Sequence, residues 1–465
     1  MRRLIVALCL LSCGTARLLA VDPVVPISVQ YAYEIPIRNH GTPTDPAITR
    51  TIAGRFDLDY DVDCVVLQDD TPVLYSGPGL YDAPIQYPAA ASGVVDIACK
   101  RAGVDGAELL TVGPAGLIGW QWDGTQFVER QIGPAGDWGN VTLLRTADLN
   151  VGGGADIIGY RFQGGVNQIV ILKDEGQPEE TMSVFNCGRA PLDIVPFVRS
   201  SGDVQIAVLT TLGVGIYAQN GDLLDAFIRV APAGTLVAVN QGQPRDDLVW
   251  TYRTGGTDKL QVIENDGTDL ALSGVVLDLG DLGVVSARAG DLDQNGADDV
   301  VLNHTQSFAV EVLLSDGNGY SLDPNHHQSH LLVAAAGTGD ASANAGWIEL
   351  SDFDSDGDLD VFAPASGDHV VHIMENGHVN GASLQPAIAD MLFGWSVDGF
   401  DSSYIRVIFE TPSLTGPLAT ATHIELVRWR KPLIPTATEV VGHRFLAEAN
   451  QEYPMIFALL DEDER

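Results

Sequence analysis

A short apolar run that ends in a glycine turn recurs seven times along this chain. The turn glycines are Gly77, Gly124, Gly176, Gly221, Gly267, Gly317 and Gly377, at spacings of 47, 52, 45, 46, 50 and 60 residues. Self-similarity at a period of about 50 residues is typical of repeat architectures and constrains the fold more than any single motif. The chain is therefore expected to consist of seven equivalent small units.

The apolar runs are short, rich in β-branched residues and bounded by Gly, Asn, Asp and Pro, as strands are. In one repeat, residues 284–287, 300–302, 308–314 and 320–322 are predicted to be four strands with hairpin connections, which make one propeller blade. Seven turns imply seven blades. The longest interval is interpreted as an insertion at 323–340 that forms a surface loop. The predicted fold class is all-β: a seven-bladed β-propeller followed by a small C-terminal β-sandwich.

The predicted propeller occupies residues 51–384. Within the preceding segment, 21–50, residues 27–33 alternate like a strand that closes the ring on the last blade, and a flexible leader is the alternative. The loop-and-turn pattern stops near residue 385, so residues 385–465 are assigned to the sandwich. Its expected strands are 404–409, 423–429, 439–445 and 455–459.

The first 20 residues resemble an export signal, with Arg2 and Arg3 before the apolar run Leu4–Leu11. That run is too short to span a bilayer, which takes about 20 residues, and no other stretch is long and apolar enough for a transmembrane helix. Two forms of cleavage remain open. Ordinary cleavage falls near Ala20, whereas a bacterial lipobox would leave a lipid anchor on Cys13. Either route predicts a secreted, periplasmic or cell-surface protein.

The chain is strongly acidic, with 62 Asp plus Glu against 25 Lys plus Arg and a formal net charge of −37. Nucleic acids and anionic lipid heads are bound through clustered cations, so both are excluded as expected partners. Such a surface favours divalent cations, basic proteins or simple solubility.

Asp-rich loops precede several of the glycine turns, most clearly at residues 291–299 and 352–360. Calcium takes six to eight oxygen ligands, and acids at alternate positions with a glycine at the sixth can supply them around a sharp bend. The candidate ligands are Asp291, Asp293, Asn295, Asp299, Asp352, Asp354, Asp356 and Asp360, with the carbonyl groups of Ala297 and Asp358. The alternative is an Asp-rich turn held by side-chain-to-backbone hydrogen bonds.

These loops resemble the FG-GAP (VCBS) repeats of integrin α-subunit-type β-propellers over about residues 50–380. In that family the loop joins two strands of a blade and binds calcium, so the resemblance implies two calcium sites, and up to four. The two further loops fit the pattern in part. They contribute Asp148, Asn150 and Asp156 in the third repeat and Asp57, Asp59 and Asp61 in the first, where Cys64 is placed at the position of the last Asp. The calcium is expected to be structural, since it neutralises crowded carboxylates.

No nucleophile, metalloprotease or nucleotide-binding motif occurs, and the histidines at 326, 327 and 330 are interpreted as part of a solvated loop. We therefore expect a non-catalytic surface or secreted interaction and adhesion module that binds a protein or glycan on a propeller face. The alternative is an extracellular carbohydrate-active enzyme, a glycan lyase or hydrolase. Acids and an aromatic residue converging on one end of the central channel would favour the enzyme, whereas an apolar or featureless mouth would favour the binding module. Six tryptophans, among them Trp347, are candidates for sugar stacking or, more often, for packing.

Overall fold

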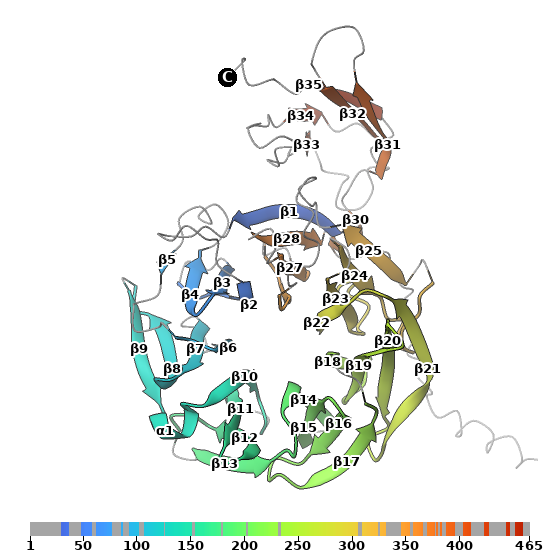
Figure 1. Cartoon of the computed structure of the whole chain (residues 1–465). Helices are drawn as coiled ribbons and strands as arrows, with labels where there is room; N and C mark the ends of the chain where they lie inside the picture. The colour runs from blue at the N-terminus through green and yellow to red at the C-terminus, as the bar shows by residue number, and fades with distance from the viewer. Residues whose placement is uncertain are drawn as a thin grey trace, which may run out of the picture.

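The computed structural model shows seven four-stranded antiparallel sheets arranged around a central channel, which is the predicted seven-bladed β-propeller (Figure 1). The residues that the structure describes are 29–36, 48–57, 62–76, 85–86, 93–101, 107–124, 126–150, 154–177, 180–200, 203–230, 234–305, 309–323, 326–331, 346–353, 357–365, 370–376, 378–379, 382–383, 387–395, 403–410, 423–426, 443–446 and 452–458.

The first four blades follow the chain in order, each from its innermost to its outermost strand. Blade 1 contains β2 (Ile48–Gly54), β3 (Asp63–Gln68), β4 (Thr71–Tyr75) and β5 (Ile85–Gln86). Blade 2 contains β6 (Asp96–Arg101), β7 (Ala107–Gly113), β8 (Gly116–Trp122) and β9 (Phe127–Ile132), and the short helix α1 (Ala135–Trp138) follows it. Blade 3 contains β10 (Val141–Ala147), β11 (Asp156–Gln163), β12 (Val166–Lys173) and β13 (Thr181–Asn186). Blade 4 contains β14 (Pro191–Ser200), β15 (Asp203–Thr210), β16 (Gly213–Tyr217) and β17 (Leu223–Ile228).

The last three blades complete the ring. Blade 5 contains β18 (Leu236–Asn240), β19 (Asp246–Thr254), β20 (Thr257–Asn265) and β21 (Leu270–Gly280). Blade 6 contains β22 (Val284–Gly290), β23 (Asp299–His304), β24 (Ala309–Leu313) and β25 (His327–Leu331). Blade 7 contains β26 (Glu349–Ser351), β27 (Asp360–Ala365), β28 (Val370–Asn376) and, from the start of the chain, β1 (Val29–Pro36).

The ring is closed by the N-terminal strand. β1 pairs antiparallel with β28, with Val29 opposite Asn376 and Pro36 opposite Val370, and so provides the outermost strand of blade 7. This pairing is one of the two alternatives that the sequence left open. Because strands from the two ends of the propeller share one sheet, opening the ring requires breaking that ladder as well as an interface between blades.

The core is divided into seven apolar clusters, and each cluster joins two neighbouring blades. Blades 1 and 7, for example, meet through Val66 and Tyr75 on one side and Phe362 and Ile373 on the other. Burying one such side chain contributes about 1.5–3 kcal/mol. The β-branched runs are therefore explained by burial on both faces of each sheet.

The predicted glycine turns lie between the third and fourth strands of blades 2 to 6. Gly124, Gly176, Gly221, Gly267 and Gly317 all have positive φ, between 76° and 97°. That backbone conformation costs an L-residue energy, and glycine adopts it freely. At Gly221 space is limiting as well, because an added Cβ would lie 2.2 Å from the Cβ of Phe185. Gly77 and Gly377 lie outside the described residues.

One expectation needs revision. Residues 323–340 were expected to be a surface loop, but His327–Leu331 forms β25, the outermost strand of blade 6, paired with β24. The expectation is wrong there because the apolar partner strand sets the pairing, while the histidine-rich sequence has no strand-like alternation.

In the C-terminal region, β31 (Ala387–Trp395), β32 (Ser403–Glu410) and β35 (Glu452–Ala458) form one sheet. β33 (His423–Leu426) pairs with β34 (His443–Leu446), and β29 (His378–Val379) with β30 (Ala382–Ser383).

These pairings establish β structure in the C-terminal region, and a β-sandwich there stays a prediction. The strand β31 was not anticipated from the sequence. Among the described residues, no helix has the length and apolar character needed to cross a membrane.

Candidate functional site

The loop between β22 and β23 brings three carboxylates together. One oxygen from each of Asp291, Asp293 and Asp299 lies within 4.8 Å of the others, and in the described part of the chain this is the one such group of His, Cys, Asp or Glu side chains. Asp293 and Asp299 are buried, and Asp291 is half-buried. Carboxylates at this separation repel one another unless a cation or proton neutralises them. The arrangement is therefore chemically suited to a hard divalent ion.

Burial and crowding act on the protonation of this group. Desolvation, followed by the nearby charge of Asp293, raises the pKa of Asp299 to about 8. Backbone N–H groups of Leu292 and Ser315, at 2.9 and 2.8 Å, oppose that rise by donating to the carboxylate. The loop thus carries an electrostatic cost that a bound cation would remove.

The other two predicted ligands of this loop help to shape it. Asn295 donates through Nδ2 to the Ser315 carbonyl oxygen at 2.7 Å and accepts from the Ala297 N–H through Oδ1 at 2.8 Å. Gly296, at φ 88°, turns its N–H toward Asp291, which accepts it at 2.9 Å. Sequence reasoning placed this glycine correctly because only a residue without Cβ makes the bend cheaply.

The last Asp of the loop has a second role, shared by four blades. Asp299, Asp156, Asp63 and Asp360 each begin the second strand of their blade, and each accepts the backbone N–H of the residue seven positions earlier, at 2.6–2.9 Å. In three blades the other carboxylate oxygen accepts an N–H from the end of the third strand, at Ser315, Asp174 or Asn376. We call these four residues the blade-staple aspartates. They tie the Asp-rich loop to the glycine turn that follows it.

The staple corrects the register assigned to the first repeat. Asp63, whose Oδ2 accepts from Phe56, occupies the position of the last Asp, so the placement of Cys64 there is wrong. Counting back by the spacing seen in blade 6 puts Arg55 where Asp291 lies and Asp57 where Asp293 lies. An arginine at the first ligand position opposes cation binding. Asp59 and Asp61 lie outside the described residues.

The loop of blade 7 is described only in part, since Asp354 and Asp356 lie outside the described residues. Asp358 and Asp360 are buried, and Asp352 is half-buried and accepts the Gly357 N–H at 3.2 Å. Gly357, at φ 101°, repeats the bend of blade 6.

The loop of blade 3 differs from that of blade 6. Asp148 and Asn150 are exposed, and Asn150 donates through Nδ2 to Asp174 at 2.7 Å. Asp156 is buried as the staple, and burial raises its pKa, with further contributions from Asp174 and Asp148. The predicted ligands are therefore present, but without the three-carboxylate cluster of blade 6.

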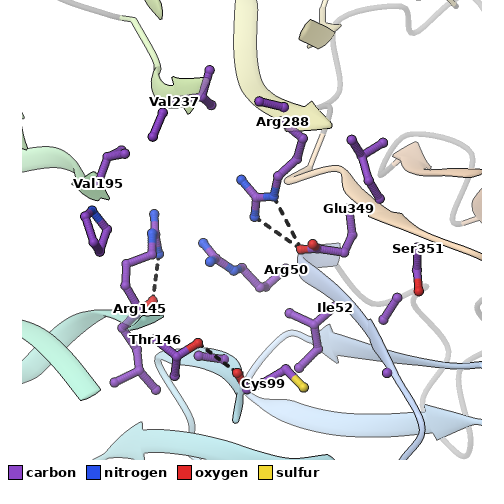
Figure 2. A pocket seen from close by; sticks show the side chains of 18 of the residues that line it. Arg50, Ile52, Cys99, Arg145, Thr146, Val195, Val237, Arg288, Glu349 and Ser351 are labelled. Atoms are coloured by element: carbon purple, nitrogen blue, oxygen red, sulfur yellow. Dashed lines mark hydrogen bonds and ion pairs between the residues drawn. The ribbon is translucent and has the colours of Figure 1, made fainter. Parts of the chain in front are cut away.

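A cavity of about 1060 Å³ occupies the central channel and is lined by residues from the inner strands of all seven blades. Figure 2 shows Arg50, Arg145 and Arg288 pointing into it from β2, β10 and β22. Apolar side chains such as Val195 and Val237 form part of its wall. The channel therefore combines an apolar wall with a group of cations inside a strongly acidic protein.

Two of these arginines are paired with acids. Arg145 contacts Asp193 at 2.5 Å, and Arg288 contacts Glu349 at 3.3 Å. A further acid, Asp96, lies 3.6 Å from both Arg50 and Arg145. The inner strands thus carry an alternating set of opposite charges around the axis.

Trp347, just before β26, lies among the three guanidinium groups. The Cζ atoms of Arg50, Arg145 and Arg288 are 4.5, 4.6 and 5.5 Å from the centroid of its ring. Because these arginines come from blades 1, 3 and 6, the indole must lie close to the channel axis. Cation–π contacts of this kind contribute about 0.5–2 kcal/mol each.

Sequence reasoning did not single out this group. Trp347 was considered for sugar stacking or packing, and its observed partners are arginines; Trp120 and Trp250 are buried between blades. The channel mouth is neither apolar nor featureless, and acids and an aromatic residue do converge on it. Three arginines in the first strands of their repeats were the available signal, but their convergence depends on the ring geometry.

Comparisons with known proteins show the fold. No known protein family and no curated protein sequence matches the chain. Among solved structures, it is similar to BBS1N in its complex with ARL6DN, with a TM-score of 0.51, 11% identity, and coverage of 76% of this chain and 98% of that one. It is also similar to the WD40 domain of Toxoplasma gondii coronin (TM-score 0.48, 10% identity, 71% and 88% covered). An Agrocybe aegerita lectin that recognises non-reducing terminal N-acetylglucosamine gives a TM-score of 0.42 at 16% identity, with 72% and 92% covered. The similarity to BBS1N supports the β-propeller and goes no further than the fold.

Proposed function

We propose that this chain is an exported, calcium-stabilised β-propeller of the FG-GAP (VCBS) kind that acts as a non-catalytic binding module. Its ligand, a glycan or a protein segment, enters the central channel from a propeller face. The observation that carries the proposal is the channel cavity itself, which is large enough for a small ligand and lined by hydrogen-bonding side chains from several blades.

Calcium has a structural role in this proposal. The three-carboxylate cluster of blade 6 supports a site there, and the loop of blade 7 is the second candidate. Both loops lead directly into the second strand of a blade, at a blade-staple aspartate. A bound ion would therefore stabilise the junction between the strands of a blade.

The pairing of the channel acids favours binding over catalysis. Asp193 and Glu349 are each engaged by an arginine, and Asp96 accepts hydrogen bonds from two backbone N–H groups. A general acid or base must be within reach of a substrate proton, and carboxylates held by guanidinium groups are poorly placed for that task.

A second candidate is an extracellular carbohydrate-active enzyme, a glycan lyase or hydrolase. The observation in its favour is the convergence of Trp347 with Asp193 and Glu349 on the channel, because sugar-processing sites combine an aromatic surface with carboxylates.

One experiment separates the two. The purified chain, in millimolar calcium, is applied to an array of neutral and acidic glycans, and the retained oligosaccharides are then incubated with it and examined by mass spectrometry. We expect retention without a change in oligosaccharide mass. Cleaved or unsaturated products would establish the enzyme, and failure to retain any glycan or to bind an acidic or neutral peptide library would contradict the binding proposal.

A further inference from the structure

Arg50 is a buried cation that has an ion pair with Asp96 but no hydrogen bond to the described residues. The residue is 5% exposed, its Nε has no hydrogen-bond partner, and the described residues accept no hydrogen bond from it. Its nearest carboxylate, Asp96, lies 3.6 Å from Nε, beyond hydrogen-bonding distance. Asp96 uses its own oxygens to accept from the backbone of Ile97 and Leu144, at 2.9 and 2.7 Å. A buried charged donor left in this state is costly, so the site favours an external acceptor.

Mutual repulsion among the channel cations adds to this imbalance. Burial, and after it the positive charge of Arg145, lowers the pKa of Arg50 to about 10, with a smaller contribution from Arg288. The attraction of Asp96 opposes this shift only in part. An anion that contacts Arg50 from the cavity would reduce this repulsion and accept hydrogen bonds from its guanidinium group.

The lining of the cavity departs from the charge balance of the chain. It includes four arginines, Arg50, Arg55, Arg145 and Arg288, and three acids, Asp193, Glu349 and Asp352. Over the whole chain, acids outnumber Lys plus Arg by 62 to 25. Asp193 and Glu349 are paired with Arg145 and Arg288, so Arg50 is left with the longer ion pair to Asp96.

We propose that the central channel binds a small carboxylate ligand, whose carboxylate accepts hydrogen bonds from Arg50 on the cavity side of the Trp347 ring, near Arg145 and Arg288. This inference rests on the proposed function and names its ligand class. Guanidinium and carboxylate are both planar and pair through two parallel hydrogen bonds, which a neutral sugar hydroxyl cannot reproduce. The apolar wall at Val195 and Val237 accommodates the rest of a molecule about the size of a monosaccharide.

A singly charged carboxylate fits this protein better than a phosphate dianion. The surface carries a large negative charge, which repels an approaching anion roughly in proportion to the anion's own charge. A singly charged hexuronate is repelled less as it approaches and still accepts the hydrogen bonds of Arg50.

The test uses isothermal titration of the full chain in millimolar calcium with three probes: sodium glucuronate, methyl glucoside and inorganic phosphate. We expect glucuronate to bind, methyl glucoside not to bind, and phosphate to bind more weakly than glucuronate. Arg50→Met should raise the Kd for glucuronate about tenfold to a hundredfold, since it removes a charged hydrogen-bonding partner. Arg288→Gln should raise the Kd for glucuronate about tenfold. Because the Arg288 side chain is partly exposed, this substitution should impair folding less than Arg50→Met.

Arg189→Gln is the matched control, because Arg189 is exposed and is not among the residues that line the cavity; its Kd should equal that of the original chain. Circular dichroism and a thermal melt verify that each variant is folded. If Arg50→Met does not fold, the Kd values of Arg288→Gln and Arg50→Lys test the inference instead. A folded channel variant whose Kd for glucuronate is unchanged overturns the inference.

Equal binding of glucuronate and methyl glucoside, tighter binding of phosphate, or no binding of glucuronate would also overturn it. These results are distinguishable from failure of the proposed function. If the chain retains a neutral glycan on the array but does not bind glucuronate, the proposed binding function stands and only the carboxylate inference fails. If no glycan, peptide or carboxylate binds, both proposals fail.

Discussion

The Asp-rich loops of blades 6 and 3 have similar sequences and different geometry. In blade 6, Asp291, Asp293 and Asp299 bring oxygens within 4.8 Å of one another. In blade 3, the staple Asp156 is equally buried, but Asp148 and Asn150 are exposed. The pattern of alternating acids thus contains two separable devices: a last Asp that fastens the backbone of the blade, and earlier acids that complete a metal cluster.

This separation explains why degenerate repeats still form blades. The fastening of the loop needs one carboxylate, and Asp63 supplies it in blade 1 by accepting the Phe56 N–H, even though Arg55 occupies the first position of that loop. Loss of the earlier acids costs a metal site and leaves the blade intact. The difference between the two loops can be tested at each device in turn.

The largest effect is expected from removing the staple in either loop. Asp299→Ala leaves the N–H groups of Leu292 and Ser315 without their acceptor, and Asp156→Ala does the same to Leu149 and Asp174. Each substitution should lower the free energy of unfolding by about 3–5 kcal/mol in calcium-free buffer, measured by urea titration.

The exposed Asp148→Ala is the control for these substitutions and should change stability by less than about 0.5 kcal/mol. A staple variant with the stability of this control would show that the carboxylate contributes nothing to the blade.

The next effect separates the metal cluster from the staple. Millimolar calcium should raise the melting temperature of the original chain by about 3–5 °C, since a ligand that binds only the folded state stabilises it by mass action. Asp291→Asn combined with Asp293→Asn should abolish the part of that shift that arises in blade 6. In chelator, the same double variant should melt at or slightly above the original temperature, because it relieves carboxylate repulsion.

Asp148→Asn in blade 3 is the matched control and should keep the full response to calcium. A double variant that retains the full calcium shift would locate the ion elsewhere in the chain.

A smaller effect is expected at the bend of the blade 6 loop. Gly296 has φ 88° and open space around its Cα, so Gly296→Ala adds backbone strain without a clash. The cost should be about 1–2 kcal/mol by urea titration. Gly221→Ala is the informative contrast: its φ is similar, but the new Cβ would meet Phe185, and it should cost more. Equal costs at the two positions would exclude packing as the reason for glycine at 221.

The smallest effect comes from making blade 3 more like blade 6. Asn150→Asp replaces a donor to Asp174 by a second carboxylate, so in chelator it should lower stability by about 0.5–1 kcal/mol. Calcium should recover that loss if the loop can close around an ion. A loss that calcium leaves unchanged, measured by melts with and without the metal, would show that the exposed geometry of Asp148 is set by the blade.

Much of the fold was predictable from local sequence. The turn glycines and β-branched runs predicted seven blades, because each unit repeats the same backbone requirement at φ values that glycine tolerates. Strand β25 was missed because its histidine-rich sequence does not alternate between apolar and polar residues. The register of the first repeat was missed because the role of Asp63 is visible in its hydrogen bonds and not in the spacing of the acids. The channel cations were unpredictable for a different reason. Arg50, Arg145 and Arg288 are far apart in sequence, and only closure of the ring brings them to one axis.

The most direct test of the metal cluster is a crystal grown in millimolar calcium. The account predicts an ion in the bend of blade 6, with oxygens of Asp291, Asp293 and Asp299 at about 2.3–2.6 Å from it. Electron density for water or for a lysine ammonium group among these three carboxylates, in a crystal whose other calcium sites are fully occupied, would contradict it.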